Sequence, residues 1–131
     1  MIFFSCFVAS SMAFLISSLY FGVKYNDEIR KAIDDATKQE KKIIAVHNHP
    51  NGMPPSLDDG VSAYAHGYDQ GVVVGHNLEV WTYGKTKEII STDVCTAVHK
   101  AISDSMSFEV ELDEELWYNR LRKYGMEVKR R

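Results

Sequence analysis

The sequence predicts an α/β (α+β) fold, with a small mixed sheet flanked by helices and a C-terminal helical extension. Two short apolar runs, residues 43–46 and 71–75, have the length and continuity of strands buried on both faces. Segments with apolar residues at helical spacing lie before and after the first run. At 131 residues the chain has the size of one domain. We divide it into an apolar segment, 1–23, a central region, 24–90, and an extension, 91–131.

Charge and cysteine content exclude some classes of protein. The net charge of −3 gives no support for a nucleic-acid-binding surface, so we expect no direct binding to nucleic acid. Cys6 and Cys95 lie far apart and lack the spacing of metal ligands. A reducing compartment is the default for such a chain, and we therefore predict a cytoplasmic location.

The first 23 residues carry no charged side chain, and the first charge is Lys24. A run of this length could span a bilayer or serve as a signal segment. Five serines dilute it, no basic residue precedes it, and residues 19–23 have the aromatic and β-branched character of a strand. A buried strand or helix is therefore favoured, and membrane association through residues 1–23 or a shortened start of a larger domain stays open.

A helix is predicted from Asn26 or Asp27 to about Gln39. Its apolar stripe comprises Ile29, Ala32, Ile33 and Ala36. The strand at 43–46 follows, and its carboxyl end is where ligands bind in open α/β sheets.

Two histidines and a carboxylate follow that strand end. His47 and His49 occupy alternate positions, so on a strand they point to the same face. Ser56 and Asp59 stand three apart after a turn rich in Gly and Pro, so they share a face of a helix start. If the helix folds back over the strand end, two imidazoles and a carboxylate converge with room for a water, as in an open zinc site.

Each part of this pattern has a simpler explanation. A histidine at a strand end is commonly a surface residue, and Ser56 with Asp59 also forms a helix capping box without any metal. The presence of all four residues within thirteen positions, directly after a buried strand, favours the metal site.

The pattern His47-x-His49-Pro50 followed by Ser56-x-x-Asp59 resembles the signature of the JAB/MPN/Mov34 (JAMM) zinc metalloprotease superfamily. The residues of this motif are closest to those of RadC-like proteins and of prokaryotic and phage JAB domains. The resemblance covers roughly residues 19–84 and is sharp over 43–59. It implies a cytidine-deaminase-like JAMM architecture and hydrolysis of a peptide or isopeptide bond in a peptide or protein substrate by a zinc-activated water. By the same resemblance, His47, His49 and Asp59 bind Zn²⁺, and Ser56 stabilises the tetrahedral intermediate.

The chain departs from the family at the loop between the two halves of the motif. Six residues separate His49 from Ser56, one fewer than is usual in the family. The shorter loop leaves Asp58 as an alternative ligand, although helix phase and the Ser-x-x-Asp spacing both favour Asp59.

A second departure concerns the general base. The family places a glutamate on an upstream strand, before a stretch matched here by residues 19–22. Ser17 and Ser18 stand there instead, no acidic residue precedes Asp27, and Glu28 is the nearest candidate base. Loss of a general acid–base residue costs a factor of roughly 10²–10⁴ in rate. The alternative function is therefore a catalytically degenerate metal-binding JAB-like domain, a scaffold in phage, mobile-element or DNA-repair-associated assemblies.

Nothing in residues 85–131 carries chemistry by itself, and Trp81 and Tyr83 are predicted core or rim aromatics, with substrate contact as the alternative. The helix opened by Ser56 is predicted to pack through Val61, Tyr64, Ala65 and Tyr68. Residues 71–75 and 79–83 form a hairpin with a tight turn at 76–78. Two helices are predicted at 92–102 and from residue 113, and the sequence does not define a substrate or an oligomeric state.

Overall fold

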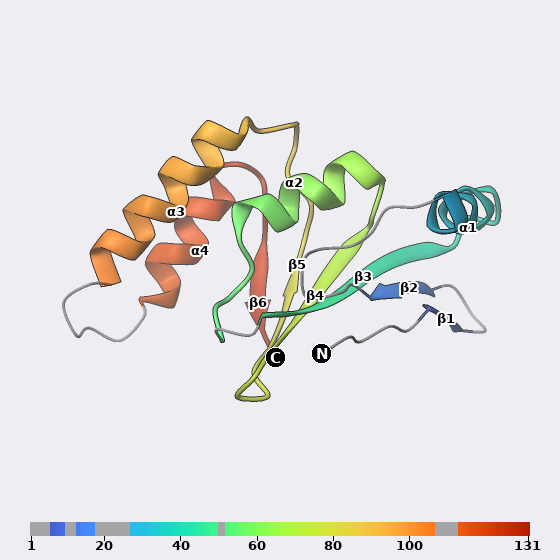
Figure 1. The fold of residues 1–131 in the computed structure, drawn as a ribbon, viewed down its shortest axis with the longest axis horizontal. Helices are drawn as coiled ribbons and strands as arrows, with labels where there is room; N and C mark the ends of the chain where they lie inside the picture. The colour runs from blue at the N-terminus through green and yellow to red at the C-terminus, as the bar shows by residue number, and fades with distance from the viewer. Residues whose placement is uncertain (1–5, 10–12, 18–26, 50–51, 107–112) are drawn as a thin grey trace.

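The computed structural model describes residues 6–9, 13–17, 27–49, 52–106 and 113–131. These residues form a six-stranded sheet in the order β1-β2-β3-β4-β5-β6, together with four helices (Figure 1). The strands are β1 (Cys6–Ala9), β2 (Ala13–Ser17), β3 (Lys42–His49), β4 (Gln70–Gly75), β5 (Val80–Tyr83) and β6 (Val128–Arg130). The helices are α1 (Asp27–Lys38), α2 (Leu57–His66), α3 (Thr92–Met106) and α4 (Glu114–Arg122).

The sheet is mixed, as the sequence predicts. Strands β2, β3 and β4 are parallel neighbours, whereas β1, β5 and β6 pair antiparallel. Helices α1 and α2 connect the parallel strands, and right-handed crossovers that step in one direction put both helices on one face. Along the sheet, α1 lies at the β2 end, α3 and α4 lie at the β6 end, and α2 lies between them (Figure 1).

The alternation of side chains along β3 positions the two histidines. Ile43 and Ala45 are buried on the helix-covered face. His47 and His49 continue the same alternation, so they project from the same face of β3 near the amino end of α2. The core on this face comprises Ile43 and Ala45 from β3, Val73 from β4, Trp81 and Tyr83 from β5, Leu57 and Ala63 from α2, and Trp117 and Leu121 from α4.

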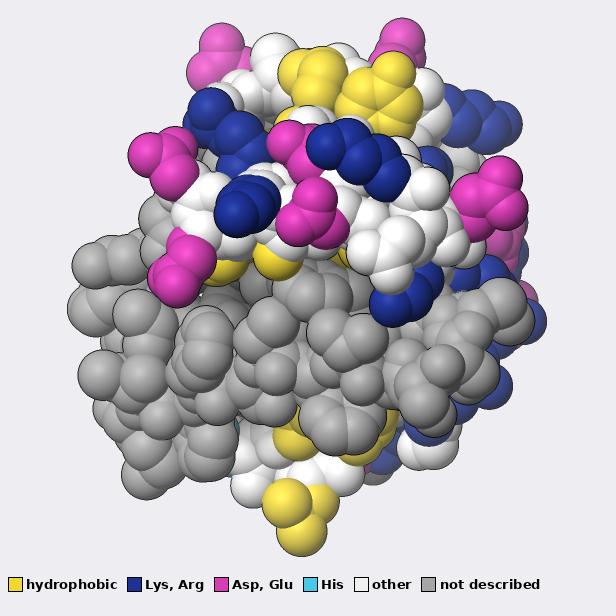
Figure 2. All heavy atoms as spheres, turned by 90° about the vertical axis from the view of Figure 1, so that its right-hand side faces the viewer, with side chains coloured by type: hydrophobic (Ala, Val, Ile, Leu, Met, Phe, Trp, Pro, Cys, Tyr) yellow, Lys and Arg dark blue, Asp and Glu magenta, His cyan; other side chains and the backbone are white. Residues whose placement is uncertain are grey.

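Helix α1 is amphipathic, as its sequence predicts. Ile33 and Ala36, three residues apart, are buried, and Ile29 and Ala32 pack beside them. Acidic and basic side chains are intermixed over the opposite surface of the helix, in the upper half of the face in Figure 2. The helix is therefore held to the sheet by its apolar stripe.

The stripe predicted after Ser56 is confirmed at Val61 and at Tyr68, which follows the end of α2, and it is wrong at Tyr64 and Ala65, which are exposed. The helix buries Leu57, Gly60 and Ala63, whereas the Tyr64 side chain is 41% exposed. A Cβ on Gly60 would lie 2.6 Å from the Met126 sulfur, so glycine allows a close approach at this point. A prediction from periodicity assigns large apolar residues to the buried face of a helix. It therefore missed that α2 packs through Gly60.

The C-terminal extension contains the two predicted helices, but it is not wholly helical. Its last strand, β6, pairs with β5 in the register Tyr83↔Val128 and Thr82↔Lys129. Val128 is buried, and charged residues follow it. A three-residue edge strand with one apolar side chain is too short to produce a recognisable alternation, which is why the sequence did not reveal it.

The described parts of segment 1–23 are strands β1 and β2 at one end of the sheet, in agreement with the expectation of a strand. The stretch 19–23 lies outside the described residues. Within the part of the chain that the structure describes, no helix combines the length and apolar character needed to cross a membrane.

Candidate metal centre

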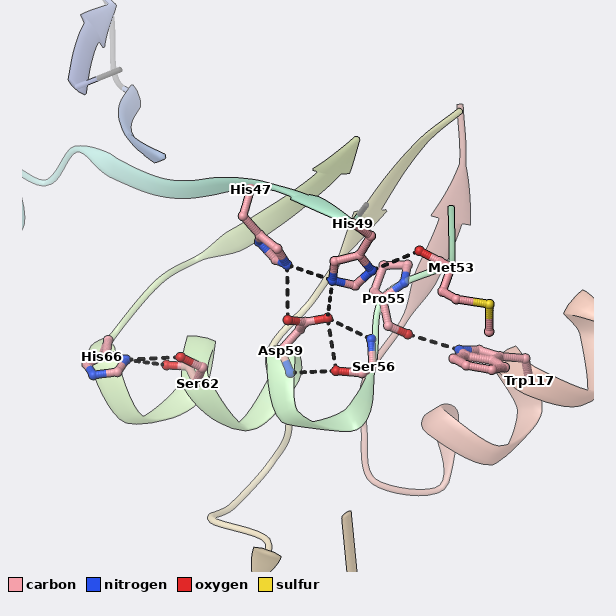
Figure 3. Close-up of polar contacts among 9 residues, drawn as sticks. All are labelled: His47, His49, Met53, Pro55, Ser56, Asp59, Ser62, His66 and Trp117. Carbon is pink, nitrogen blue, oxygen red and sulfur yellow. Dashed lines mark hydrogen bonds and ion pairs between the residues drawn. The ribbon is translucent and has the colours of Figure 1, made fainter. Parts of the chain in front are cut away.

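His47, His49 and Asp59 converge between the end of β3 and the first turn of α2 (Figure 3). The two imidazole Nε2 atoms lie 3.1 Å apart. Asp59 Oδ1 lies 3.1 Å from Nε2 of His47, and Asp59 Oδ2 lies 3.4 Å from Nε2 of His49. This group could hold a metal ion, because its three ligand atoms all lie within 4.8 Å of one another. His66 points away from it and contacts Ser62 instead (Figure 3).

The spacing and exposure of these atoms fit a small tetrahedral ion. Nitrogen and oxygen ligands at about 2.0–2.2 Å from such an ion stand roughly 3.3–3.6 Å apart, close to the separations observed here. The side chains of His47, His49 and Asp59 are 13%, 19% and 17% exposed. A bound ion would therefore be held by protein atoms and would still be reachable from solvent.

The electrostatics of the cluster favour a cation. Burial alone would raise the pKa of the Asp59 carboxyl, but hydrogen bonds and charge from His47 and His49 hold it well below its usual range. Burial opposes protonation of His49, but the contact with Asp59 and backbone hydrogen bonds at Met53 and Pro54 outweigh it and raise the His49 pKa. The carboxylate is thus ionised, and a metal ion would compete with the proton for His49.

A backbone carbonyl sets the orientation of His49. Its Nδ1 lies 2.8 Å from the Met53 carbonyl oxygen. A carbonyl oxygen only accepts, so Nδ1 donates its proton there, and in the neutral ring Nε2 then faces the centre with its lone pair. Such support of a histidine by an outer hydrogen bond is general for metal-ligating imidazoles.

The start of α2 fixes Asp59. Ser56 is the N-cap, its N–H donates to Asp59 Oδ2 at 2.7 Å, and the Asp59 N–H donates to Ser56 Oγ at 3.3 Å. The Ser56 hydroxyl also donates to Asp59 Oδ2 at 3.0 Å. These bonds form the capping box that was the simpler explanation of the sequence, and the same carboxylate faces the histidines. The Asp59 carboxylate therefore belongs both to the helix capping box and to the candidate ligand set.

The choice between Asp58 and Asp59 follows from the helix phase. Asp58 is exposed and lies on the side of α2 that faces α3, where it interacts with Cys95. Burial, with the charge and hydrogen bond of Asp58, raises the pKa of the Cys95 thiol to about 11. Asp59 is the carboxylate that reaches the histidines, as the Ser-x-x-Asp spacing predicts.

Glu28 is not brought into this cluster. It is exposed in the first turn of α1, and it is not one of the three ligand groups that converge. Ser17, at the end of β2, is the register partner of Val46, directly before His47. The strand end where the resemblance places a glutamate is therefore beside the histidine strand, but it carries serine; Ser18 and residues 19–22 lie outside the described residues.

Two aromatic residues near the centre, Tyr83 and Trp117, were not among the site residues predicted from the sequence. The Tyr83 ring stands edge-on to His47, with centroids 6.0 Å apart and an interplanar angle of 76°. Trp117 Nε1 donates to the Pro55 carbonyl oxygen at 2.9 Å (Figure 3). Both side chains are buried and belong to the core.

Comparisons of this chain with protein-family models, with curated proteins and with solved structures found no match. The arrangement of the described side chains is therefore the basis for assigning a function.

Proposed function

We propose that this protein is a JAMM-type zinc hydrolase that cleaves a peptide or isopeptide amide bond in a peptide or protein substrate. The observation that carries the proposal is the convergence of His47, His49 and Asp59 at one strand end and one helix start. The geometry of the site supports a bound metal ion only. The reaction class is inferred from the resemblance of the motif to that of the JAMM superfamily.

Each residue of the site has a separate proposed role. His47, His49 and Asp59 hold the ion, and two neutral imidazoles with one carboxylate are a common ligand set of catalytic zinc. Bound zinc supplies Lewis-acid chemistry, because it lowers the pKa of water and polarises a carbonyl. Partial exposure of the three side chains leaves a side from which water and a substrate carbonyl can approach.

Ser56 is the residue proposed to stabilise the transition state. Its hydroxyl lies 3.0 Å from Asp59 Oδ2, beside the ligand set, and an O–H donor there can turn to a substrate oxygen as negative charge develops on it. A donor aimed at developing charge in this way is worth about 10²–10³ in kcat.

The second candidate is a metal-binding scaffold without hydrolytic activity. The specific observation in its favour is that Glu28 is exposed on α1 and does not join the three ligands. Without a residue that moves protons, the rate falls by roughly 10²–10⁴, and the metal site then serves to organise the strand end and α2.

Metal content separates a metal protein from one without a metal. We expect about one zinc per chain in purified wild-type protein, measured by elemental analysis after exhaustive dialysis. His47→Ala removes a ligand and is expected to abolish stoichiometric zinc. His76→Ala is the matched control, because His76 is an exposed histidine in the turn after β4 and should leave the zinc content unchanged. Equal zinc in wild type and His47→Ala would refute the site.

Hydrolysis of a generic isopeptide substrate separates the two candidate functions. Activity that disappears in His47→Ala supports the hydrolase, whereas a zinc-loaded protein without activity supports the scaffold. Glu28→Gln tests Glu28 as the base: a loss of activity with full zinc content would assign it that role, and unchanged activity would exclude it.

A further inference from the structure

We infer that Trp117, from the C-terminal helix α4, is a positioning residue of the metal centre. Its indole N–H donates to the Pro55 carbonyl oxygen, and it thereby fixes the segment 53–56 that supports both His49 and Asp59. This inference rests on the proposed metal-binding function. The experiment that tests it gives one result if Trp117 has no positioning role and a different result if the protein binds no metal.

The segment 53–56 carries two prolines in succession, which limits its backbone hydrogen bonds. Pro54 and Pro55 are fully buried and carry no backbone N–H, so they cannot donate to a neighbouring strand. The Pro55 carbonyl, in contrast, needs a donor in this buried setting, and Trp117 supplies it. On either side of this bond, the Met53 carbonyl accepts from His49 and the Ser56 N–H donates to Asp59. A shift of Pro55 would therefore move the outer partners of two ligands together.

Helix α4, which carries Trp117, is held by contacts of Tyr118 and Glu114 that do not involve the metal centre. The Tyr118 hydroxyl donates to Glu114 at 2.7 Å and accepts from Trp81 Nε1 at 3.2 Å, which ties α4 to β5. Glu114 also accepts from Arg130 of β6 at 2.8 Å. Helix α4 is thus attached to two strands, and Trp117 transmits that attachment to a segment 62 residues earlier in the chain.

Metal centres respond to such support. Ligands have to be held to within about 0.5 Å of their productive positions, and loss of an outer-shell partner lowers metal affinity by about 10–100-fold. The predicted consequence is that replacing the indole by a phenyl ring, which removes the N–H donor and keeps an aromatic side chain, weakens zinc binding by a factor in this range.

The test compares Trp117→Phe with Leu121→Val. Leu121 lies one turn further along α4 and is fully buried, so its shortening lowers stability while both partners of the Trp117–Pro55 hydrogen bond remain present. Zinc affinity is measured by competition with a chromophoric chelator, and Co²⁺ is substituted to record the ligand-field spectrum. We expect Trp117→Phe to bind zinc about 10–100-fold more weakly with an altered cobalt spectrum, and Leu121→Val to match wild type in both.

A wild-type affinity and spectrum in Trp117→Phe would overturn the inference, as would an equal loss of affinity in Leu121→Val. If wild-type protein binds neither zinc nor cobalt, the proposed function itself has failed.

A second measurement needs no variant. By linkage, a bond that favours zinc is strengthened by zinc, so the indole N–H of Trp117 should exchange with solvent more slowly when zinc is added. The Trp81 indole, the other one in the chain, bonds to Tyr118 of the same helix, so its response measures the part that comes from stabilisation of α4 as a whole. Equal responses of the two indole signals would overturn the inference.

Discussion

At the scale of single residues, a glycine on one strand makes room for a tyrosine from the next. Gly71 and Tyr83 are register partners, and a Cβ on Gly71 would overlap the Tyr83 ring. The ring therefore crosses β4 and reaches His47 on β3. Burial, with the charges of Asp59 and Tyr68, raises the pKa of the Tyr83 phenol well above its usual value, so Tyr83 stays neutral beside the site.

Gly71→Ala is expected to destabilise the protein by about 1–3 kcal/mol, because overpacking forces the Tyr83 ring away from His47. Zinc affinity should fall with it, since His47 loses the ring that packs on its edge. The free energy of unfolding in urea and a zinc titration provide the two readouts. Gly84→Ala is the control, because a Cβ there meets its nearest neighbour at 3.9 Å. If the two alanine variants behave alike, the role assigned to Gly71 is wrong.

At the scale of elements, the first turn of α2 joins helix capping to ligand placement. The motif was readable in the sequence because a capping box and a strand alternation are local patterns, and each depends on residues two or three positions apart. The prediction of strand 43–46, of Ser56 as N-cap and of Asp59 near the histidines is confirmed. The packing face of α2 was not predictable, because it depends on the fit of Gly60 against Met126.

Ser56→Ala removes the cap and the hydroxyl that donates to Asp59. We expect a loss of about 1 kcal/mol in the free energy of unfolding. Ser56→Thr keeps a hydroxyl at the same position and should retain most of that stability. Urea denaturation of the zinc-free proteins measures this effect without the metal. A Ser56→Ala protein as stable as wild type would show that the capping box contributes nothing.

At the scale of the whole molecule, the cluster of His47, His49 and Asp59 makes the stability of the folded state depend on pH and on metal binding. The low pKa of Asp59 adds stability that is complete above about pH 4 and is lost as the pH falls through its folded-state value. The raised pKa of His49 adds stability that is complete below about pH 6.5 and is lost as the pH rises through its folded-state value. The metal-free pair is therefore strongest between about pH 4 and 6.5.

Zinc should reverse this dependence between pH 6 and 8, because it binds the deprotonated imidazole. In EDTA, the contribution of the His49–Asp59 pair should decrease over this interval, whereas the stabilisation added by zinc should increase. At a free zinc concentration of 100 times Kd that stabilisation is about 2.7 kcal/mol. Urea denaturation at both pH values, with and without zinc, measures it, and His49→Gln removes the linked group. Equal stabilisation by zinc at pH 6 and pH 8 would contradict the prediction.

The sequence by itself determined the candidate ligands, the helix that caps beside them and the mixed character of the sheet. Helical and strand periodicity are properties of neighbouring residues, so His47, His49 and Asp59 could be assigned before any packing was known. Only the tertiary structure decided that β6 forms the edge strand beside β5, that Gly71 leaves space for the Tyr83 ring, and that Trp117 donates to Pro55. Each of these depends on contacts between distant parts of the chain, which leave no periodic signal along it.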